Sequence, residues 1–469
     1  MARLSRQIGA WLDERAGLGG LVRTVFLRNV PLGVGVLYTL GFAAAFVFVL
    51  QAVTGIALAL FYAPTPDHAY ASVTFVMMDV SFGRVLRGLH HWGSSAMVVL
   101  VVAHLVVVYA FAAYKRPREV TWFVGVVLLL LTLAFAFTGY LLPWDERAFW
   151  ATSVGTNMIG TVPYVGEFLL RAARGGSELG AATLTRFYAI HVLILPAITG
   201  ALVFAHVALV IWHGVSVPPS LWGSQEGSAD RADSEAARYA SFKQRGRPFW
   251  PDVIAEDLVV AVVVFSIILA IAVAVGAPLD RPADPTNASY IPRPEWYFLF
   301  LFELLRYFPG QLEWVGVALL PAVGILVVLI IPLVDRGPER QLLRRPVAAV
   351  SAVVLAGSVA FLTTSAALTS PPPTDEGGRT LTAAQVLGRI HYRQYCEGCH
   401  GRSGEGAPDG PSLAAAAQKG DGGFIHSYIE SPDRLNRRAL MPGFLAQMGH
   451  QQVEETTQFV LTLVSEGGP

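Results

Sequence analysis

The sequence is poor in charge and in cysteine. Of its 469 residues only 14% are charged and 54% are hydrophobic, whereas a soluble domain carries roughly 25% charged residues. Two cysteines are too few for a disulfide framework. Because 34 Lys and Arg balance 34 Asp and Glu, no basic excess favours nucleic acid as a partner. These shortages exclude a disordered chain, a disulfide-stapled domain and a nucleic-acid-binding protein, and they leave a polytopic membrane protein.

Seven long apolar runs account for this composition. A run of about 18 or more apolar residues predicts a transmembrane helix. The runs that reach this length are residues 32–61, 85–112, 120–142, 186–212, 254–276, 313–334 and 347–368. We therefore predict an all-α fold built on a seven-helix transmembrane bundle.

Basic residues predict the orientation of these helices, because cytoplasmic loops are enriched in Lys and Arg. With an amphipathic N-terminal segment, residues 1–31, in the cytoplasm, the cytoplasmic segments hold 17 Lys and Arg and the outer segments hold nine. An odd number of spans then delivers the residues after 370 to the outer side. There a proline-rich linker at 369–380 precedes a small polar domain at 381–469.

Histidines inside two of the apolar runs are the main functional signal, because ionisable residues within a membrane are costly and usually functional. His90 and His104 are 14 positions apart, so they share a helix face and lie about 21 Å apart along the axis. His191 and His206 are 15 positions apart and lie about 22 Å apart. The neighbouring His91 falls on a different face from His104.

These spacings predict two histidine pairs at two depths. Both runs cross the membrane in the same direction, so His90 and His191 lie near the outer end, and His104 and His206 near the inner end. Two imidazoles on opposite helices form a natural axial cage for haem iron, whereas zinc or copper favours three or four ligands at one depth. The alternative for each histidine is a hydrogen bond to a neighbouring helix.

Glycines repeat at a matching spacing in the first and third runs. Gly41 and Gly55 are 14 positions apart, and so are Gly125 and Gly139. Glycine lacks the side chain that would obstruct a flat macrocycle, so the match to the histidine repeat indicates clearance for haem. The alternative is small-residue packing between membrane helices.

Both cysteines lie in the C-terminal domain, in a C-x-x-C-H run formed by Cys396, Cys399 and His400. This run indicates covalent haem attachment, with His400 as an iron ligand. A redox dithiol and a zinc site are the alternatives, and the adjacent histidine, the outer placement and the lack of a second cysteine pair favour haem. The sixth iron ligand should be a methionine or histidine further along the chain, and the candidates are Met441, Met448 and His426.

Several separated motifs resemble cytochrome b of the bc and bf quinol-oxidising complexes, over roughly residues 20–365. The histidine spacings and the seven spans resemble the chloroplast-type bf form, with two of its subunits fused into one chain. The stretch around Met441 resembles the methionine loop of small class I cytochromes c. The matching motifs are Leu86–Trp92, Lys115–Glu119, Gly139–Asp145, Thr185–Tyr188 and Pro294–Tyr297.

The resemblance implies a division of the chain into domains. A four-helix di-haem domain at 32–213 would be followed by a cytoplasmic linker at 214–253. A three-helix domain with a Pro-Glu-Trp-Tyr loop would occupy 254–368, and a small helical cytochrome c domain would occupy 381–469.

The resemblance also implies an outer quinol site. Glu295 would accept the proton from quinol, beside Tyr140 and Tyr297, because a positioned carboxylate suits proton transfer. The alternative for Glu295 is a capped carboxylate at the membrane interface. An amphipathic surface helix at Val162–Leu170 would border the pocket. Further residues of this site would be Pro143, Pro294 and Trp296.

Other implied roles concern the haems and an inner quinone site. Arg87 and Arg118 would pair with haem propionates, and ordinary snorkelling arginines are the alternative. Some relatives attach a further haem through a cysteine where Thr39 stands, so we expect no covalent haem in the membrane part. Candidates for inner proton uptake, each otherwise a solvated helix-end residue, are His213, Asp252, Glu256 and Asp257.

The implied function is that of a quinol–cytochrome c oxidoreductase subunit with two non-covalent b haems and one covalent c haem. Quinol would be oxidised on the outer side of a bacterial-type plasma membrane. One electron would pass through a Rieske iron–sulfur protein and the c haem to a soluble cytochrome c or a terminal oxidase. The other would cross through the b haems to the inner quinone site, and a proton gradient would result. The implied assembly is a homodimer within a larger complex.

Two other hypotheses remain at this stage. A di-haem b subunit could anchor a dehydrogenase and relay its electrons to quinone. The C-terminal domain could be a docking module with a structural haem.

Overall fold

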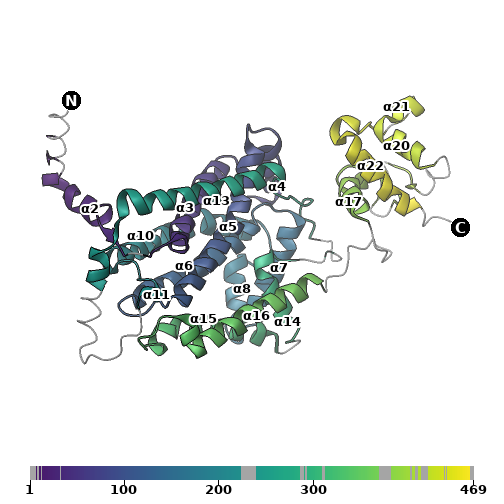
Figure 1. The fold of residues 1–469 in the computed structure, drawn as a ribbon. Coiled ribbons are helices and arrows are strands. Elements are labelled where there is room, and N and C mark those ends of the chain that lie inside the picture. The colour runs from purple at the N-terminus through teal and green to yellow at the C-terminus, as the bar shows by residue number, and fades with distance from the viewer. Residues whose placement is uncertain are drawn as a thin grey trace. The chain divides into compact units, whose positions relative to one another are not determined.

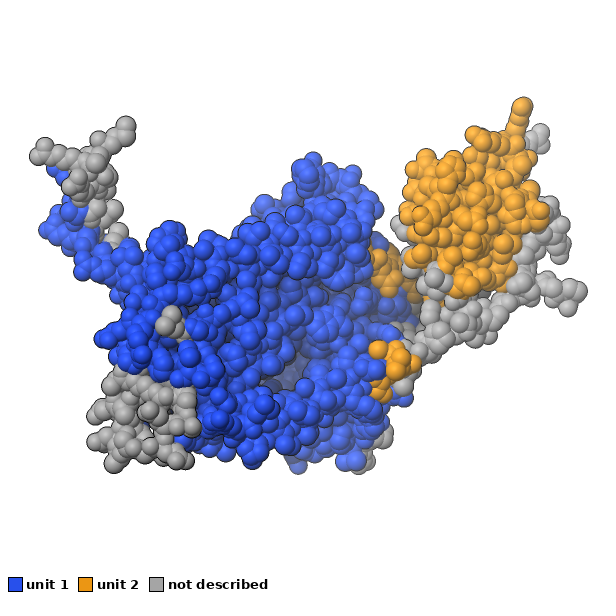
Figure 2. All heavy atoms as spheres, in the orientation of Figure 1, with its two compact units in different colours: residues 1–278, 284–364 blue, residues 279–283, 365–469 orange. Residues whose placement is uncertain are grey.

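The computed structural model describes residues 7–464 except 8–9, 12, 32, 223–238, 286–289, 291–292, 309–311, 369–381, 402–403, 407–409, 414–420, 438 and 440. It divides into two compact units (Figure 2). The membrane unit comprises residues 1–278 and 284–364, and the small unit comprises residues 279–283 and 365–469. The predicted proline-rich linker at 369–380 lies outside the described residues.

Among the described residues, seven helices are long and apolar enough to cross a membrane, which agrees with the predicted number of spans. The fifth begins at Phe249, five residues earlier than predicted, because the turn η3 (Phe249–Val253) continues into α13. The spans are Val36–Ala59, Gly83–Ala110, Glu119–Tyr140, Ala181–His213, Phe249–Ala274, Val315–Val334 and Pro346–Leu368.

Three of these spans begin with a short turn, a fourth contains one in its interior, and other helices connect the spans. The spans are built from η1 (Val36–Thr39) with α3 (Leu40–Ala59), α5 (Gly83–Ala110), α6 (Glu119–Tyr140), α9 (Ala181–Ala189) with η2 (Ile190–Ile194) and α10 (Leu195–His213), η3 with α13 (Ile254–Ala274), η6 (Val315–Leu319) with α15 (Leu320–Val334), and α16 (Pro346–Leu368). The connecting helices are α2 (Leu18–Val25), α4 (Pro66–Met78), α7 (Glu146–Gly160), α8 (Gly166–Arg174), α11 (Pro219–Trp222), η4 (Trp296–Phe298), α14 (Leu299–Leu305) and η7 (Leu342–Arg344).

The core of the membrane unit is a bundle around α5 (Figure 1). Helices α3 and α13 both pack on α5, and α10 packs on α6. Gly88 permits the close approach of α5 to α13, because a Cβ there would lie 2.9 Å from the Cβ of Ala272. Within the described ranges, the only sheet consists of two short strands, β1 (Asn29–Val30) and β2 (Arg247–Pro248), which pair antiparallel.

The surface helix predicted at 162–170 is shifted along the chain. Residues 161–165 form a turn, and α8 begins at Gly166 and ends at Arg174. A Cβ at Gly166 would lie 2.3 Å from the carbonyl oxygen of Gly160, so the chain turns back tightly on itself at this glycine. This turn delays the start of the helix.

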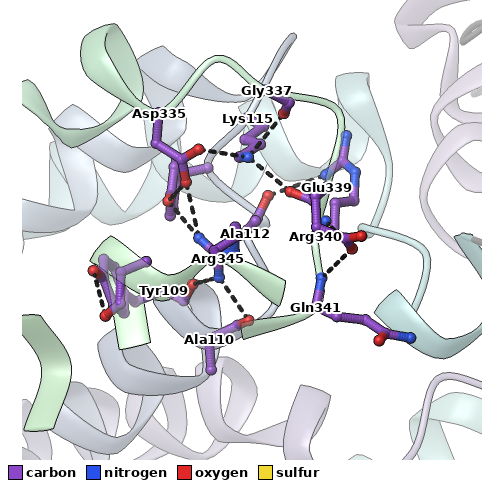
Figure 3. Close-up of polar contacts among 12 residues, drawn as sticks. Tyr109, Ala110, Ala112, Lys115, Asp335, Gly337, Glu339, Arg340, Gln341 and Arg345 are labelled. Atoms are coloured by element: carbon purple, nitrogen blue, oxygen red, sulfur yellow. Dashed lines mark hydrogen bonds and ion pairs between the residues drawn. The ribbon is translucent and has the colours of Figure 1, made fainter. Parts of the chain in front are cut away.

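A buried group of charged residues, which we call the Lys115 cluster, joins the α5–α6 connection to the α15–α16 connection (Figure 3). Lys115 Nζ lies 2.7 Å from Asp335 Oδ1 and donates to the carbonyl oxygens of Gly337 and Glu339, at 2.8 Å each. Arg345 Nη1 donates to Asp335 Oδ2 at 2.9 Å, and its Nη2 donates to the carbonyl oxygens of the α5 end.

The charges of this cluster are matched by hydrogen bonds. Burial alone would raise the pKa of Asp335, but hydrogen bonds from Lys115, Tyr114 and Arg345 outweigh it and hold that pKa below its usual value. Burial lowers the pKa of Lys115. The cluster therefore fastens the part of the chain before residue 214 to the part after residue 282.

The small unit is a compact set of helices with its own apolar core. Its first and last helices cross at Gly388, where a Cβ would lie 1.8 Å from the carbonyl oxygen of Glu455. Tyr392 and Phe459 pack against each other beside this crossing. The helices are α17 (Ala383–Tyr395), α18 (Glu397–His400), α20 (Gly422–Glu430), α21 (Pro432–Leu435) and α22 (Leu445–Val464).

Candidate functional site

The structure brings the four membrane histidines together as two facing pairs. The ring centroids of His90 and His191 are 6.3 Å apart, and those of His104 and His206 are 6.5 Å apart. Metal–imidazole bonds of about 2 Å on both sides, plus about 1 Å from each nitrogen to its ring centre, give a centroid separation of roughly 6 Å. Each pair therefore has the spacing that one six-coordinate iron needs between two axial imidazoles.

Threonine side chains set the orientation of the first histidine pair. Thr54 Oγ1 donates to the carbonyl oxygen of Leu50 at 2.7 Å and lies 3.0 Å from His90 Nδ1. Because its hydrogen is used, the Thr54 oxygen accepts from the histidine. Thr138 Oγ1 lies 3.1 Å from His191 Nδ1 in the same arrangement. An Nδ1–H hydrogen bond leaves the Nε2 lone pair free for a metal ion.

The four repeated glycines each face one of these histidines. A Cβ on them would come within 2.5–3.3 Å of the imidazole Cε1 atom. The glycines therefore make room for the imidazole rings. The prediction above was that they make room for the macrocycle. The contacts pair Gly41 with His104, Gly55 with His90, Gly125 with His206 and Gly139 with His191.

A π-turn reconciles the two unequal histidine spacings. His191 lies in η2, where the Leu195 N–H bonds to the Ile190 carbonyl five residues earlier. A π-turn accommodates one extra residue within a helix, and Pro196, which follows, has no N–H to give. The 15-residue spacing of His191 and His206 thus places the two rings on one face, as the 14-residue spacing does for His90 and His104.

A cavity of about 350 Å³ adjoins the first histidine pair. Its lining includes His90 and His191 together with Tyr140, Glu295 and Tyr297. Pro143 also lines it, whereas Pro294 and Trp296 do not, and the Trp296 side chain is 45% exposed. The structure therefore gathers most of the predicted quinol-site residues around one space.

An ion pair in the lining of this cavity joins α7 to the segment that precedes η4 and holds Glu295. Arg147 Nη2 lies 3.2 Å from Glu295 Oε1, and the Arg147 guanidinium lies 5.7 Å from the centre of the Tyr140 ring. Tyr140 Oη donates to the carbonyl oxygen of Arg293 at 3.3 Å. The arrangement offers a carboxylate, a fixed cation and phenol hydroxyls to a ligand in the cavity.

The two arginines predicted to bind propionates lie at opposite ends of the bundle. Arg87 lines the cavity and donates to the carbonyl oxygens of Ala277 and Pro278, at 3.0 and 2.7 Å. Arg118 donates to the carbonyl oxygen of Gly214 at 3.0 Å and is buried, which lowers its pKa. Both guanidinium groups are thus oriented by backbone oxygens.

The candidates for inner proton uptake have different surroundings. Asp252 is exposed, and Glu256 is held by Arg247 through two hydrogen bonds. Asp257 is buried, with 7% of its surface exposed. His213 accepts a hydrogen bond from Arg118 through its backbone oxygen. None of the four lines the cavity beside His90 and His191. The Thr39 hydroxyl, at the position discussed above for a covalent haem, donates to the Val36 carbonyl oxygen.

In the small unit, the residues of the C-x-x-C-H run are oriented by their neighbours. His400 is buried, and its Nδ1 lies 2.9 Å from the carbonyl oxygen of Pro411, which leaves Nε2 free for a metal ion. Burial raises the pKa of the Cys396 thiol to about 12. Redox dithiols have a lowered pKa instead, so the surroundings of Cys396 do not favour that alternative; Cys399 is exposed.

The candidates for the sixth ligand are also placed differently. Met441 is partly buried at the edge of an apolar cluster, whereas Met448 is part of its core, with 5% of its surface exposed. His426 Nε2 lies 3.6 Å from a carboxylate oxygen of Glu454. Met448 packs in the core of the cluster and His426 lies beside Glu454, so Met441 remains the favoured candidate.

Sequence reasoning missed three residues of the membrane site. Thr54 and Thr138 each directly precede a repeated glycine, so the Thr-Gly pairs at 54–55 and 138–139 were a usable signal. Arg147 carried no such signal, because its partner Glu295 is distant in the sequence.

Comparisons with known proteins agree with this geometry. The family model described as cytochrome b/b6/petB matches residues 26–214, that of cytochrome b(C-terminal)/b6/petD matches residues 282–385, and that of cytochrome c matches residues 385–464. Families of these two kinds carry haem b and haem c.

Individual relatives and a solved structure match as well. Cytochrome b6 of Oltmannsiellopsis viridis is 40% identical over 208 residues, which are 44% of this chain and 97% of the relative. Cytochrome b6 of Synechococcus sp. (strain RCC307) is 38% identical over 208 residues, 44% of this chain and 95% of the relative. A hyperthermophilic respiratory Complex III chain matches with a TM-score of 0.66 and 29% identity, over 78% of this chain and 92% of that one. The chain therefore belongs to the cytochrome b/b6 family and joins both cytochrome b portions to a cytochrome c domain, as an integral membrane electron-transfer subunit of the quinol-oxidoreductase type.

Proposed function

We propose that this chain is the cytochrome b and c subunit of a quinol–cytochrome c oxidoreductase in a bacterial-type plasma membrane. Its N-terminus and the Lys115 cluster would face the cytoplasm, and the Glu295 cavity and the cytochrome c domain would face outward. The excess of Lys and Arg in the cytoplasmic segments supports this orientation.

The histidines would hold the haems. His90 with His191, and His104 with His206, would hold the irons of two non-covalent b haems. Cys396 and Cys399 would bind one c haem covalently, and His400 and Met441 would hold its iron. When bound, these groups supply one-electron stations between the two sides of the membrane.

The Glu295 cavity is assigned as the site of quinol oxidation. Quinol loses two electrons and two protons, and Glu295 accepts one of these protons from a quinol hydroxyl, while Tyr140 and Tyr297 line the pocket. One electron passes to a separate Rieske iron–sulfur protein and onward to a soluble cytochrome c or an oxidase. The other crosses to a quinone site near Asp257, and a homodimer within a larger complex is the expected assembly.

The observation that carries this proposal is the separation of the histidine ring centroids, 6.3 Å for His90 and His191 and 6.5 Å for His104 and His206. The first pair lies beside a cavity that is also lined by the Glu295 carboxylate. A reduced-minus-oxidised spectrum with pyridine haemochrome quantitation tests it, and two b haems per c haem are expected. His104→Leu should remove one b haem and leave the c haem. Unchanged b-haem content would contradict the ligand assignment.

A truncation distinguishes the role of the cytochrome c domain. Removing residues 371–469 should abolish electron delivery from quinol to an external acceptor, while the b haems remain reducible by quinol. Full activity without the domain would reject it as the electron exit and favour a docking role.

A further inference from the structure

A charged side chain with no assigned role lines the same cavity as Glu295. Arg147 lies in the first turn of α7, with Nη2 3.2 Å from Glu295 Oε1. The Glu295 side chain is 15% exposed and that of Arg147 is 35% exposed. The pair is therefore partly shielded from water, at a place where a ligand in the cavity can reach it.

Helix formation does not account for an arginine at this position. The N-terminal turn of a helix carries a partial positive charge and disfavours cations. The N-terminus of α7 is capped by Asp145, whose side chain accepts a hydrogen bond from the Ala148 N–H at 2.8 Å. What compensates the Arg147 charge is tertiary: the Glu295 carboxylate and the face of the Tyr140 ring.

Arg147 stays a cation throughout the pH range of catalysis. Burial alone would lower its pKa, but Tyr140, Glu295 and neighbouring acidic groups outweigh burial and raise the pKa above its usual value. The titratable and charged groups around the pair are Arg87 and His91 on α5, Tyr140 on α6, Asp145 before α7, and Tyr290 and Tyr297 on the Glu295 segment.

We propose that Arg147 is a positioning residue for quinol oxidation, which holds the Glu295 carboxylate turned into the cavity so that it accepts a proton from quinol. The inference rests on the function proposed above. When the proton moves, the quinol O–H bond breaks, its electron pair stays on the quinol oxygen, and an O–H bond forms on Glu295. Arg147 then loses its anionic partner, which frees the protonated side chain to turn away and release the proton.

The ion pair predicts a specific kinetic signature. Arg147 acts through Glu295, so losing its cation should lower the rate at which bound quinol gives up a proton more than it weakens quinol binding. A lysine should replace it in large part, because the contact with Glu295 is between opposite charges.

The test uses the assembled complex with its Rieske partner and measures kcat and KM for quinol in quinol–cytochrome c reductase turnover. Arg147→Met should lower kcat by about tenfold, with a KM for quinol changed less than kcat. Arg147→Lys, which keeps a cation, should restore most of kcat. Arg171→Met is the matched control, because Arg171 pairs with Glu167 on the exposed surface of α8, and its kcat and KM should equal those of the wild type.

The outcomes separate this inference from the proposed function. If the wild-type complex does not oxidise quinol, the proposed function fails. If the wild type is active and Arg147→Met leaves kcat unchanged, or if Arg147→Lys loses as much activity as Arg147→Met, the inference is overturned. Should Arg147→Met lose its b-haem absorbance, Arg147→Gln carries the same prediction, because it removes the charge and keeps a hydrogen-bond donor.

Discussion

At each end of the membrane unit, charged side chains join the part of the chain before residue 214 to the part after residue 282. At one end, Arg147 and Glu295 form an ion pair beside a cavity of about 350 Å³. At the other, Lys115 and Arg345, with 7% and 6% of their side-chain surfaces exposed, share the Asp335 carboxylate and also donate to backbone carbonyls.

The difference lies in the partners available to each charge. In the Lys115 cluster the carboxylate is fixed by Lys115, Tyr114 and Arg345, so removing the anion would leave two buried cations without it (Figure 3). The Glu295 carboxylate pairs with Arg147 and also lines the cavity, where a ligand can reach it. An ion pair enclosed by backbone oxygens fastens two segments, whereas one that borders a cavity is available for chemistry.

The largest effect should follow from neutralising the carboxylate at the cavity. Glu295→Gln keeps the shape and removes the proton acceptor, so quinol–cytochrome c reductase activity should fall by about 10²–10⁴-fold. Haem content, read from the difference spectrum, should stay at the wild-type ratio. Activity within twofold of the wild type would show that Glu295 is only an interfacial carboxylate.

The matching change at the other end should affect stability instead of chemistry. Asp335→Asn leaves Lys115 and Arg345 without their anion, at a cost of about 3 kcal/mol or more. Thermal loss of b-haem absorbance in detergent measures it, and the surviving complex should retain normal turnover per b haem. Glu167→Gln, which breaks an exposed pair with Arg171, is the control and should leave the midpoint unchanged. A normal midpoint for Asp335→Asn would contradict the fastening role.

The Lys115 cluster should also give the complex an acid-sensitive stability. The pKa of Asp335 is lower in the folded protein than in an unfolded chain, so its stabilisation is present above the unfolded value of about 3.9 and is lost as the pH falls through the folded value. The wild-type melting midpoint should therefore drop more steeply below about pH 4 than that of Asp335→Asn. Parallel curves for the two proteins would argue against this role of Asp335.

The smallest effect is expected at the exposed pair of Arg247 and Glu256. Its side chains are 26% and 43% exposed, so Glu256→Gln should change the free energy of unfolding by less than about 1 kcal/mol. Turnover should also stay near the wild-type value if Asp257, which is buried, is the inner proton carrier. A large loss of turnover would assign proton uptake to Glu256.

Much of the fold and part of the site were predictable. Hydrophobic length predicted the seven spans, because a helix must cross a fixed thickness of hydrocarbon. Helical periodicity predicted the two depths of the histidines, because residues 14 positions apart return to nearly the same face. The C-x-x-C-H run at 396–400 predicted a cytochrome c domain, and the cytochrome c family model matches residues 385–464. These features are encoded locally, within one helix or one short motif.

Tertiary structure decided the rest. The pairing of Arg147 with Glu295 and of Lys115 with Asp335 brings together residues that are distant in the sequence, and no local pattern fixes such distances. The π-turn at Ile190–Ile194 altered the phase of His191 by one residue. The sequence alone therefore determined which helices are long enough to cross the membrane and which side chains are candidates to bind iron, because these follow from length and period. Which charges meet, and whether they meet beside a cavity or inside a closed network, depended on how the helices pack.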